Sequence, residues 1–411
     1  FNATNTTSGN IAFINTAAPL TIAGISQAGN GTTTVNNTGA LTTSGLVTTT
    51  GTGLITLQAT GTETIGAAGI TASAGPANVT LTSTAGSLVL NGNVNAGTGA
   101  VALSAVAGTI TQGAFTITAS ALGVAATAVP ALTTSGTLAT IAANITGAAN
   151  PFSFTQAATF DVGTVGPISG VTTNGGTISL TASTGNLTMS QNVNAGAAAV
   201  NLMATAGSIT ETGTALINGT VLTTNSVTGQ TLNGANTVGT FNATNTTSGN
   251  IAFINTAAPL TIAGISQAGG GNVSVSNTGA ITTTTAPITT AANGTISLQA
   301  TTGTLTVGQA VTAGGSGTVG LTTTGGGNAI TLNAAVSSGS GQITATSAGA
   351  VTENAGGTFG TSGLLQTSSA GGQTLGQANT VGSFNATNTT SGNVQLINTA
   401  APLTITGISE T

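Results

Sequence analysis

Lysine, arginine, histidine, cysteine, tryptophan and tyrosine are all missing from this sequence of 411 residues. General acid–base catalysis draws mainly on His, Lys, Tyr, Cys or paired carboxylates, so most catalytic arrangements are excluded. Transition metals are held by Cys or His, and nucleic acids and anionic membranes are bound through Lys and Arg. The composition therefore predicts no enzymatic activity, no cofactor, no transition-metal site and no nucleic-acid partner.

Acidic side chains are nearly missing as well, since the chain has only Glu63, Asp161, Glu211, Glu353 and Glu410. Glycoside cleavage needs two carboxyl groups within about 10 Å, whereas Glu63 and Glu211 lie far apart in the sequence. Glu211 and Glu353 follow an Ile-Thr or Val-Thr pair, a place that Gln112 takes in another repeat, and we interpret it as a solvated turn position. A single Asp also argues against clustered calcium ligands.

The sequence has no apolar run as long as a membrane-spanning helix requires, no disulfide-forming residue, and no recognisable signal peptide or lipidation motif. We therefore expect no membrane insertion. So few charges predict a surface on which salt and pH have little effect. Yet 39% of the residues are apolar, which is more than low-charge disorder favours, so we expect a folded chain.

What the chain does have is repetition. The segment FNATNTTSGNIAFINTAAPLTIAGISQAG fills residues 1–29 and again 241–269, and FNATNTTSGNVQLINTAAPLTITGIS returns at 384–409. We interpret the chain as repeat modules at 1–140, 141–240 and 241–383, with a further module starting at 384–411, all in one continuous solenoid. We expect it to be a window of a longer repetitive protein.

A shorter repeat lies inside these modules. Val79 and Val101 are 22 residues apart in the sequence, and Ile296, Val319 and Ile343 follow one another at spacings of 23 and 24 residues. Each phrase alternates apolar with small polar residues, which is typical of a half-buried strand, and Gly, Asn and Ser stand at the expected turns. Repeats of roughly 20–24 residues with two or three short strands predict an all-β fold, a parallel β-helix (β-solenoid) of about twenty coils.

Differences between the repeat copies indicate which side chains face inward. Ile251 and Phe253 become Val394 and Leu396, while Ala252 between them becomes Gln395. Two apolar replacements flank a change from apolar to polar. We therefore expect positions 251 and 253 to point into the core and position 252 to point to solvent.

Phrases of the form G-x-I/V-x-L-x-A/T-x-x-G-x-I/L-T run through nearly the whole chain, with GTITQG at 108–113, GSITETG at 207–213 and GAVTENAGG at 349–357. They resemble the repeats of the filamentous-haemagglutinin type and of the long passengers of bacterial autotransporter and two-partner-secreted proteins. The resemblance implies a right-handed parallel β-helix, export across an outer membrane, and a role as a surface adhesin or extracellular fibre. No functional residue of that family can be placed on this chain.

The sequence thus predicts an extracellular or cell-surface structural protein that forms a filament, sheath or fibre, with further copies of itself as its partner. One alternative is an adhesin stalk or passenger that binds a surface glycan. A second is an ice-binding solenoid, which needs Thr in register on successive coils; the pairs that include Thr80 and Thr82 do not maintain such a row, and another face is left open. Sequons offer possible glycosylation sites at Asn2, Asn5, Asn242, Asn245, Asn385 and Asn388.

Overall fold

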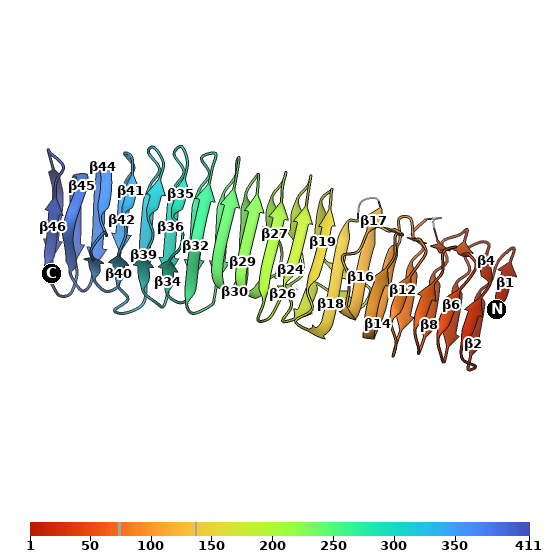
Figure 1. Ribbon diagram of the computed structural model, residues 1–411. Coiled ribbons are helices and arrows are strands. Elements are labelled where there is room, and N and C mark those ends of the chain that lie inside the picture. The colour runs from red at the N-terminus through yellow and green to blue at the C-terminus, as the bar shows by residue number, and fades with distance from the viewer. Residues whose placement is uncertain (73–74, 136–137) are drawn as a thin grey trace. The chain divides into compact units, whose positions relative to one another are not determined.

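The computed structural model describes residues 1–72, 75–135 and 138–411. The described residues form short β-strands without a helix, and the fold is a parallel β-solenoid of about 18 turns, which confirms the predicted fold class and comes close to the predicted number of coils. Figure 1 shows successive strands lying side by side within each of two parts of the chain. The chain divides into two compact units, residues 1–201 and 202–411. No helix that could span a membrane occurs among the described residues.

In unit 1, strands of successive coils pair in parallel and build three rows. The first row is β2 (Ile11–Asn15), β5 (Thr33–Asn37), β8 (Ile55–Ala59), β11 (Val79–Ser83), β14 (Ala100–Gln112), β16 (Ala121–Ala128) and β18 (Thr140–Ala148). The second is β3 (Leu20–Ile22), β6 (Leu41–Thr43), β9 (Glu63–Ile65), β12 (Leu88–Leu90) and the end of β14. The third is β1 (Asn2–Asn5), β4 (Gly24–Gln27), β7 (Val47–Thr49), β10 (Ile70–Thr71), β13 (Val94–Asn95), β15 (Ile117–Thr118) and β17 (Thr134–Ser135).

Beyond β18 the first row of unit 1 divides, because β18 pairs with two later strands. These are β20 (Phe160–Val162), which continues to β25 (Leu187–Met189), and β23 (Val171–Asn174), which continues to β26 (Val193–Asn194). A parallel pair of β19 (Phe152–Gln156) and β24 (Ile178–Ala182) runs beside them. A short antiparallel hairpin of β21 (Thr164–Val165) and β22 (Ile168–Ser169) is inserted between β20 and β23.

Unit 2 repeats this arrangement, after β27 (Ala199–Ala204), β28 (Ile209–Glu211), β29 (Ile217–Ser226) and β30 (Gln230–Asn245). Its first row is β31 (Ile251–Asn255), β33 (Val273–Asn277), β36 (Ile296–Ala300), β39 (Val319–Thr323), β42 (Ile343–Thr346) and β44 (Phe359–Ser369). Its second row is β32 (Leu260–Gln267), β34 (Ile281–Thr283), β37 (Leu305–Val307), β40 (Ile330–Leu332), β43 (Val351–Glu353) and β45 (Gln373–Asn388). The third row links the end of β32 to β35 (Ile288–Thr290), β38 (Val311–Ala313), β41 (Val336–Ser338) and the start of β44; β46 (Val394–Asn398) and β47 (Thr404–Glu410) follow.

Residues that the sequence repeat places one repeat apart are paired in neighbouring strands of the structure. Val79 pairs with Val101, and Ile296, Val319 and Ile343 pair in succession. Because strands of a parallel stack repeat at about 4.8 Å, each inward side chain lies against its counterpart one coil away. Burial alternates along the strands, as in the pattern buried, half-buried, buried of β12. Each fully buried Val, Leu or Ile contributes about 1.5–3 kcal/mol of hydrophobic stabilisation.

The comparison of repeat copies also predicted the inward face correctly. Ile251 and Phe253 are buried, and Ala252 between them is half-exposed. Large aromatic side chains are tolerated inside as well: Phe253 stacks on Phe241 with ring centroids 4.1 Å apart, and both rings are buried.

Within unit 2 the repeated segment returns on a different row. Six successive strand pairings lead from Ile251 in the first row to Phe384. Phe241, the counterpart of Phe384 in the previous copy, pairs instead with Ile262 in β32. The interval from Phe241 to Phe384 is therefore six coils and part of a seventh. As a result, the copy that begins at Phe384 lies one row further around the coil than the copy that begins at Phe241.

Candidate functional site

Three of the five acidic side chains lie inside the solenoid. Glu63 is 0% exposed, Glu353 is 6% exposed and Glu211 is 9% exposed. The interpretation of Glu211 and Glu353 as solvated turn residues is therefore wrong. Each is the last residue of a three-residue strand that alternates buried, half-buried, buried, so its side chain points inward like the Ile or Val two residues earlier.

Glu211 and Glu353 have matching surroundings. Oε2 of Glu211 accepts hydrogen bonds from the Gly234 backbone amide at 2.7 Å and from Nδ2 of Asn236 at 3.2 Å. Its other oxygen, Oε1, has no hydrogen-bond partner among the described residues. Burial raises the pKa of Glu211 above its ordinary value of 4.5, and these two hydrogen bonds oppose the shift only in part.

In the second copy, Oε2 of Glu353 accepts from the Gln377 backbone amide at 2.9 Å and from Nδ2 of Asn379 at 3.1 Å. Its Oε1 likewise lacks a partner within the described chain. Burial raises the pKa of Glu353 for the same reason. The carboxyl–amide pair thus recurs with the repeat module, shortly before each of the two later copies of the repeated segment.

Glu63 is more isolated. It stands in the second row of unit 1 between Leu41 and Leu88, and neither of its oxygens forms a hydrogen bond with a described residue. Burial raises the pKa of Glu63 well above 4.5, and the nearby Thr82 backbone amide, which falls short of hydrogen-bond geometry, opposes this shift without cancelling it. A carboxyl group held this way is protonated and neutral under conditions in which an exposed one is ionised.

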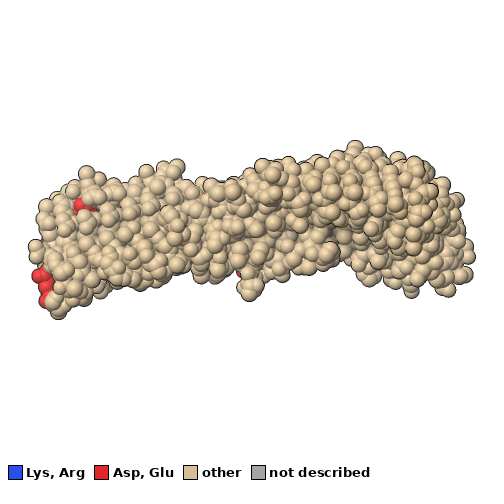
Figure 2. Space-filling model, turned by 90° about the horizontal axis from the view of Figure 1, so that it is seen from below, with Lys and Arg blue, Asp and Glu red and all other residues tan. Residues whose placement is uncertain are grey.

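The two remaining acidic residues, Asp161 and Glu410, have surroundings of a different kind. Asp161 in β20 accepts hydrogen bonds from Oγ1 of Thr188 at 3.0 Å and from the Ser190 backbone amide at 3.0 Å. Glu410 is exposed in β47. No group of three or more His, Cys, Asp or Glu side chains that could hold a metal ion occurs in the described part of the chain. Figure 2 shows a face on which acidic atoms appear at only a few points.

The structure separates the six sequon asparagines into two kinds. Asn2 and Asn242 are exposed, and Asn385 is half-exposed. These three stay predicted acceptors.

Asn245 and Asn388 are buried. Nδ2 of Asn245 donates to the Ser248 carbonyl at 2.7 Å and to Oε1 of Gln267 at 3.0 Å. Asn5, at the same place in the first copy, is half-exposed and donates to the carbonyls of Ser8 and Gly9 at 3.0 Å. A glycan is attached through this amide nitrogen, so a glycan at Asn245 or Asn388 would have to displace the buried hydrogen bonds.

Outward Thr side chains form a ladder that the sequence did not reveal. In the second row of unit 2 the second residue of every strand is Thr, and all of these residues pair in register: Thr261, Thr282, Thr306, Thr331, Thr352 and Thr374. The outward pairs that were compared in the sequence, such as Thr80 and Thr82, lie in the first row, where the type of outward residue varies from coil to coil. Only the strand register shows which Thr residues stand one above another.

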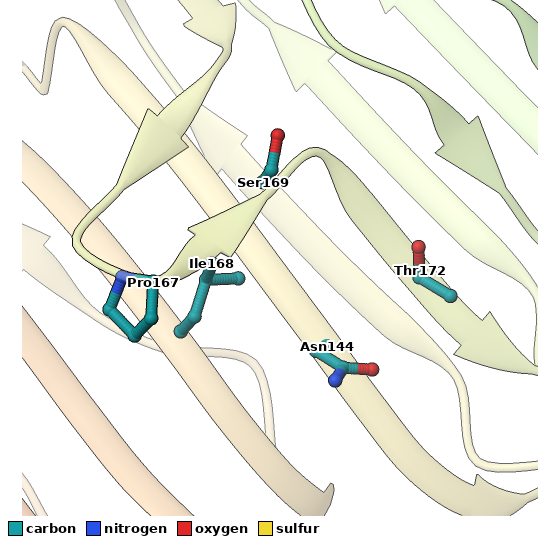
Figure 3. Close-up of a pocket in the computed structure, with 5 residues that line it drawn as sticks. All are labelled: Asn144, Pro167, Ile168, Ser169 and Thr172. Atoms are coloured by element: carbon teal, nitrogen blue, oxygen red, sulfur yellow. The ribbon is translucent and has the colours of Figure 1, made fainter.

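Unit 1 has a second local feature, shown in Figure 3. Pro167 and Ile168, in the β21–β22 hairpin, overhang Asn144 of β18 and Thr172 of β23. The hollow that they line has a volume of about 380 Å³. No residue that lines it is charged, and the hairpin interrupts the repetitive pattern of strands in unit 1.

Comparison with known proteins identifies no relative: no family model, no curated protein and no solved structure matches the chain.

The three buried glutamates predict an unusual dependence of stability on pH. Their pKa values are raised by folding, so between pH 4.5 and the folded-state pKa values the folded chain binds more protons than the unfolded chain. The free energy of unfolding should therefore be highest below about pH 4.5 and should fall as the pH rises through the folded-state values. Urea unfolding followed by circular dichroism from pH 4 to pH 8 measures this, and a stability that rises with pH would contradict it.

Replacing Glu63 by Leu should stabilise the protein, because Leu continues the apolar row of Leu41 and Leu88 and removes a buried group without a hydrogen bond. We expect a gain of about 1–3 kcal/mol at pH 7 and a smaller gain at pH 4. Glu410→Gln, at an exposed position, is the control and should change little. An equal gain at both pH values would show that ionisation of Glu63 does not contribute.

Proposed function

We propose that this chain is a mechanical element of an extracellular fibre, filament or sheath. The observation that carries this proposal is the parallel pairing of coil upon coil through unit 2, with two copies of one segment embedded in that stack at 241–269 and 384–409. In such a stack each coil contacts only its neighbours, so modules can be added without redesigning a core. The resemblance to repeats of the filamentous-haemagglutinin type supports an extracellular setting.

The energetics of the stack suit that role. Stability comes from backbone hydrogen bonds between coils and from stacked apolar rows, neither of which is screened by salt as surface ion pairs are. The surface carries few charges and no basic side chain. A fibre exposed to changing ionic strength would keep its cohesion.

We also propose that the partner of this chain is a further copy of itself. A coil at the end of any parallel stack has unpaired backbone N–H and C=O groups, which pair readily with another strand edge. Coils built from one repeated sequence offer matching edges. Association would then extend the same hydrogen-bond pattern from one chain to the next.

Electron microscopy and fibre diffraction of the purified chain test the fibre proposal. We expect long uniform filaments and a meridional reflection near 4.8 Å, about the spacing of paired strands. Folded particles that stay monomeric at 38.4 kDa and form no filament at any concentration would contradict it.

Ice binding is a second candidate function, and the six-residue Thr ladder of unit 2 is the observation that favours it. Hydroxyl and methyl groups repeat there at the coil spacing of about 4.8 Å, which is the kind of regular array that an ice surface requires.

A thermal-hysteresis assay tests this candidate directly. If the ladder binds ice, the wild-type chain should depress the freezing point, and Thr306→Tyr in the middle of the ladder should remove most of that activity. Thr322→Tyr, at an outward position of the first row, is the matched control and should retain it. Wild-type protein without thermal hysteresis would exclude the candidate.

A further inference from the structure

The β21–β22 hairpin rests on the outer surface of unit 1. Val165 of the hairpin is only 3% exposed, and a Cβ added to Gly123 in β16 would lie 3.2 Å from the Val165 side chain. The close seat of the hairpin therefore depends on glycine at position 123. With Val165 anchored, Pro167 and Ile168 at the hairpin turn are held over the neighbouring strands (Figure 3).

Two adjoining hollows lie along the hairpin turn, of about 380 Å³ and about 330 Å³, and Asn144, Pro167 and Ile168 line both of them. We call them together the hairpin groove. Its floor follows one outward position through five consecutive coils, whose residues pair in register: Thr82, Ser104, Ala125, Asn144 and Thr172. The groove therefore runs across the strands, in the direction in which coils stack.

The chemistry of the groove is amphipathic and uncharged. The side chains of Thr82, Ser104, Asn144 and Thr172 make no hydrogen bond to another described residue, so their donors and acceptors are free for a ligand. Val106, which is 50% exposed, adds an apolar surface beside Pro167 and Ile168. An ionic ligand would find no counter-charge there, because no lining residue is acidic or basic.

We propose that the hairpin groove binds a linear, uncharged polysaccharide. Sugar rings present hydroxyl groups at their rims and C–H groups on their faces, which match the free hydroxyl and amide groups of the floor and the apolar surface of the hairpin turn. The coils rise by about 4.8 Å each, so a chain lying in the groove would place successive rings over successive coils. This inference rests on the proposed function, since it would make the fibre adhesive.

A microarray of neutral and anionic polysaccharides, followed by titration calorimetry with a neutral oligosaccharide that binds, tests the inference. We expect the wild-type chain to bind at least one neutral linear glycan, and Asn144→Ala to weaken binding about tenfold through the loss of its hydrogen bonds. Asn36→Ala is the matched control, because Asn36 occupies the same outward position three coils before Ser104 and lies away from the hairpin. Its affinity should equal that of the wild type.

Three results would overturn the inference: no binding to any neutral glycan, binding to anionic glycans alone, or equal losses in Asn144→Ala and Asn36→Ala. Ile168→Asp tests a second copy of the chain as the occupant; if it disperses self-associated material in sedimentation experiments, the groove belongs to an interface between copies and the inference fails. Thermal unfolding of each variant confirms that it folds. Filaments without glycan binding would support the fibre proposal and contradict the groove inference. Glycan binding without filaments would support the groove inference and contradict the fibre proposal.

Discussion

Parallel hydrogen bonding between successive coils is the constraint on which the rest of this structure depends. It places every side chain about 4.8 Å from its counterparts above and below. Two like charges at that distance repel by about 1 kcal/mol in water and by several times more near a protein surface. A repeated charged position would multiply this cost along the whole row. The near absence of charged residues, and the use of Thr, Ser and Asn at outward positions, follow from that geometry.

Inside the stack, the same constraint makes polar residues acceptable only when neighbouring coils supply partners. Nδ2 of Asn255 donates to Oδ1 of Asn277 one coil away at 2.9 Å, so buried amides satisfy one another along a row. Asn236 bonds one oxygen of Glu211 in a comparable way. Glu63 has only Leu41 and Leu88 in its row and no such partner. Of the three buried carboxyl groups, it is the one whose two oxygens both lack a hydrogen-bond partner among the described residues.

Much of this fold could be predicted from the sequence because a parallel stack converts sequence spacing directly into contact. The distance from Val79 to Val101 in the sequence is one coil, and the structure pairs these two residues. The direction of Glu211 was also within reach: Ile209 points in and Thr210 out, so the same alternation places Glu211 inside. Its place after the Ile-Thr pair, which Gln112 takes in another repeat, suggested a solvated turn, but Glu211 is still part of the strand, as its last residue. The β21–β22 hairpin was not predicted, because Gly166 and Pro167 indicate a turn without showing that the two short strands beside it pair in antiparallel fashion.

The row on which a repeated feature lies depends on module length as well as on sequence. Ile254 and Ile397 are counterparts in successive copies, and both are exposed, by 40% and 46%. Ile254 lies in the first row of unit 2, whereas Ile397 lies in β46, which pairs with the start of β45 in the second row. Since the interval between these copies is not a whole number of coils, two nearly identical segments face different directions around the stack of unit 2.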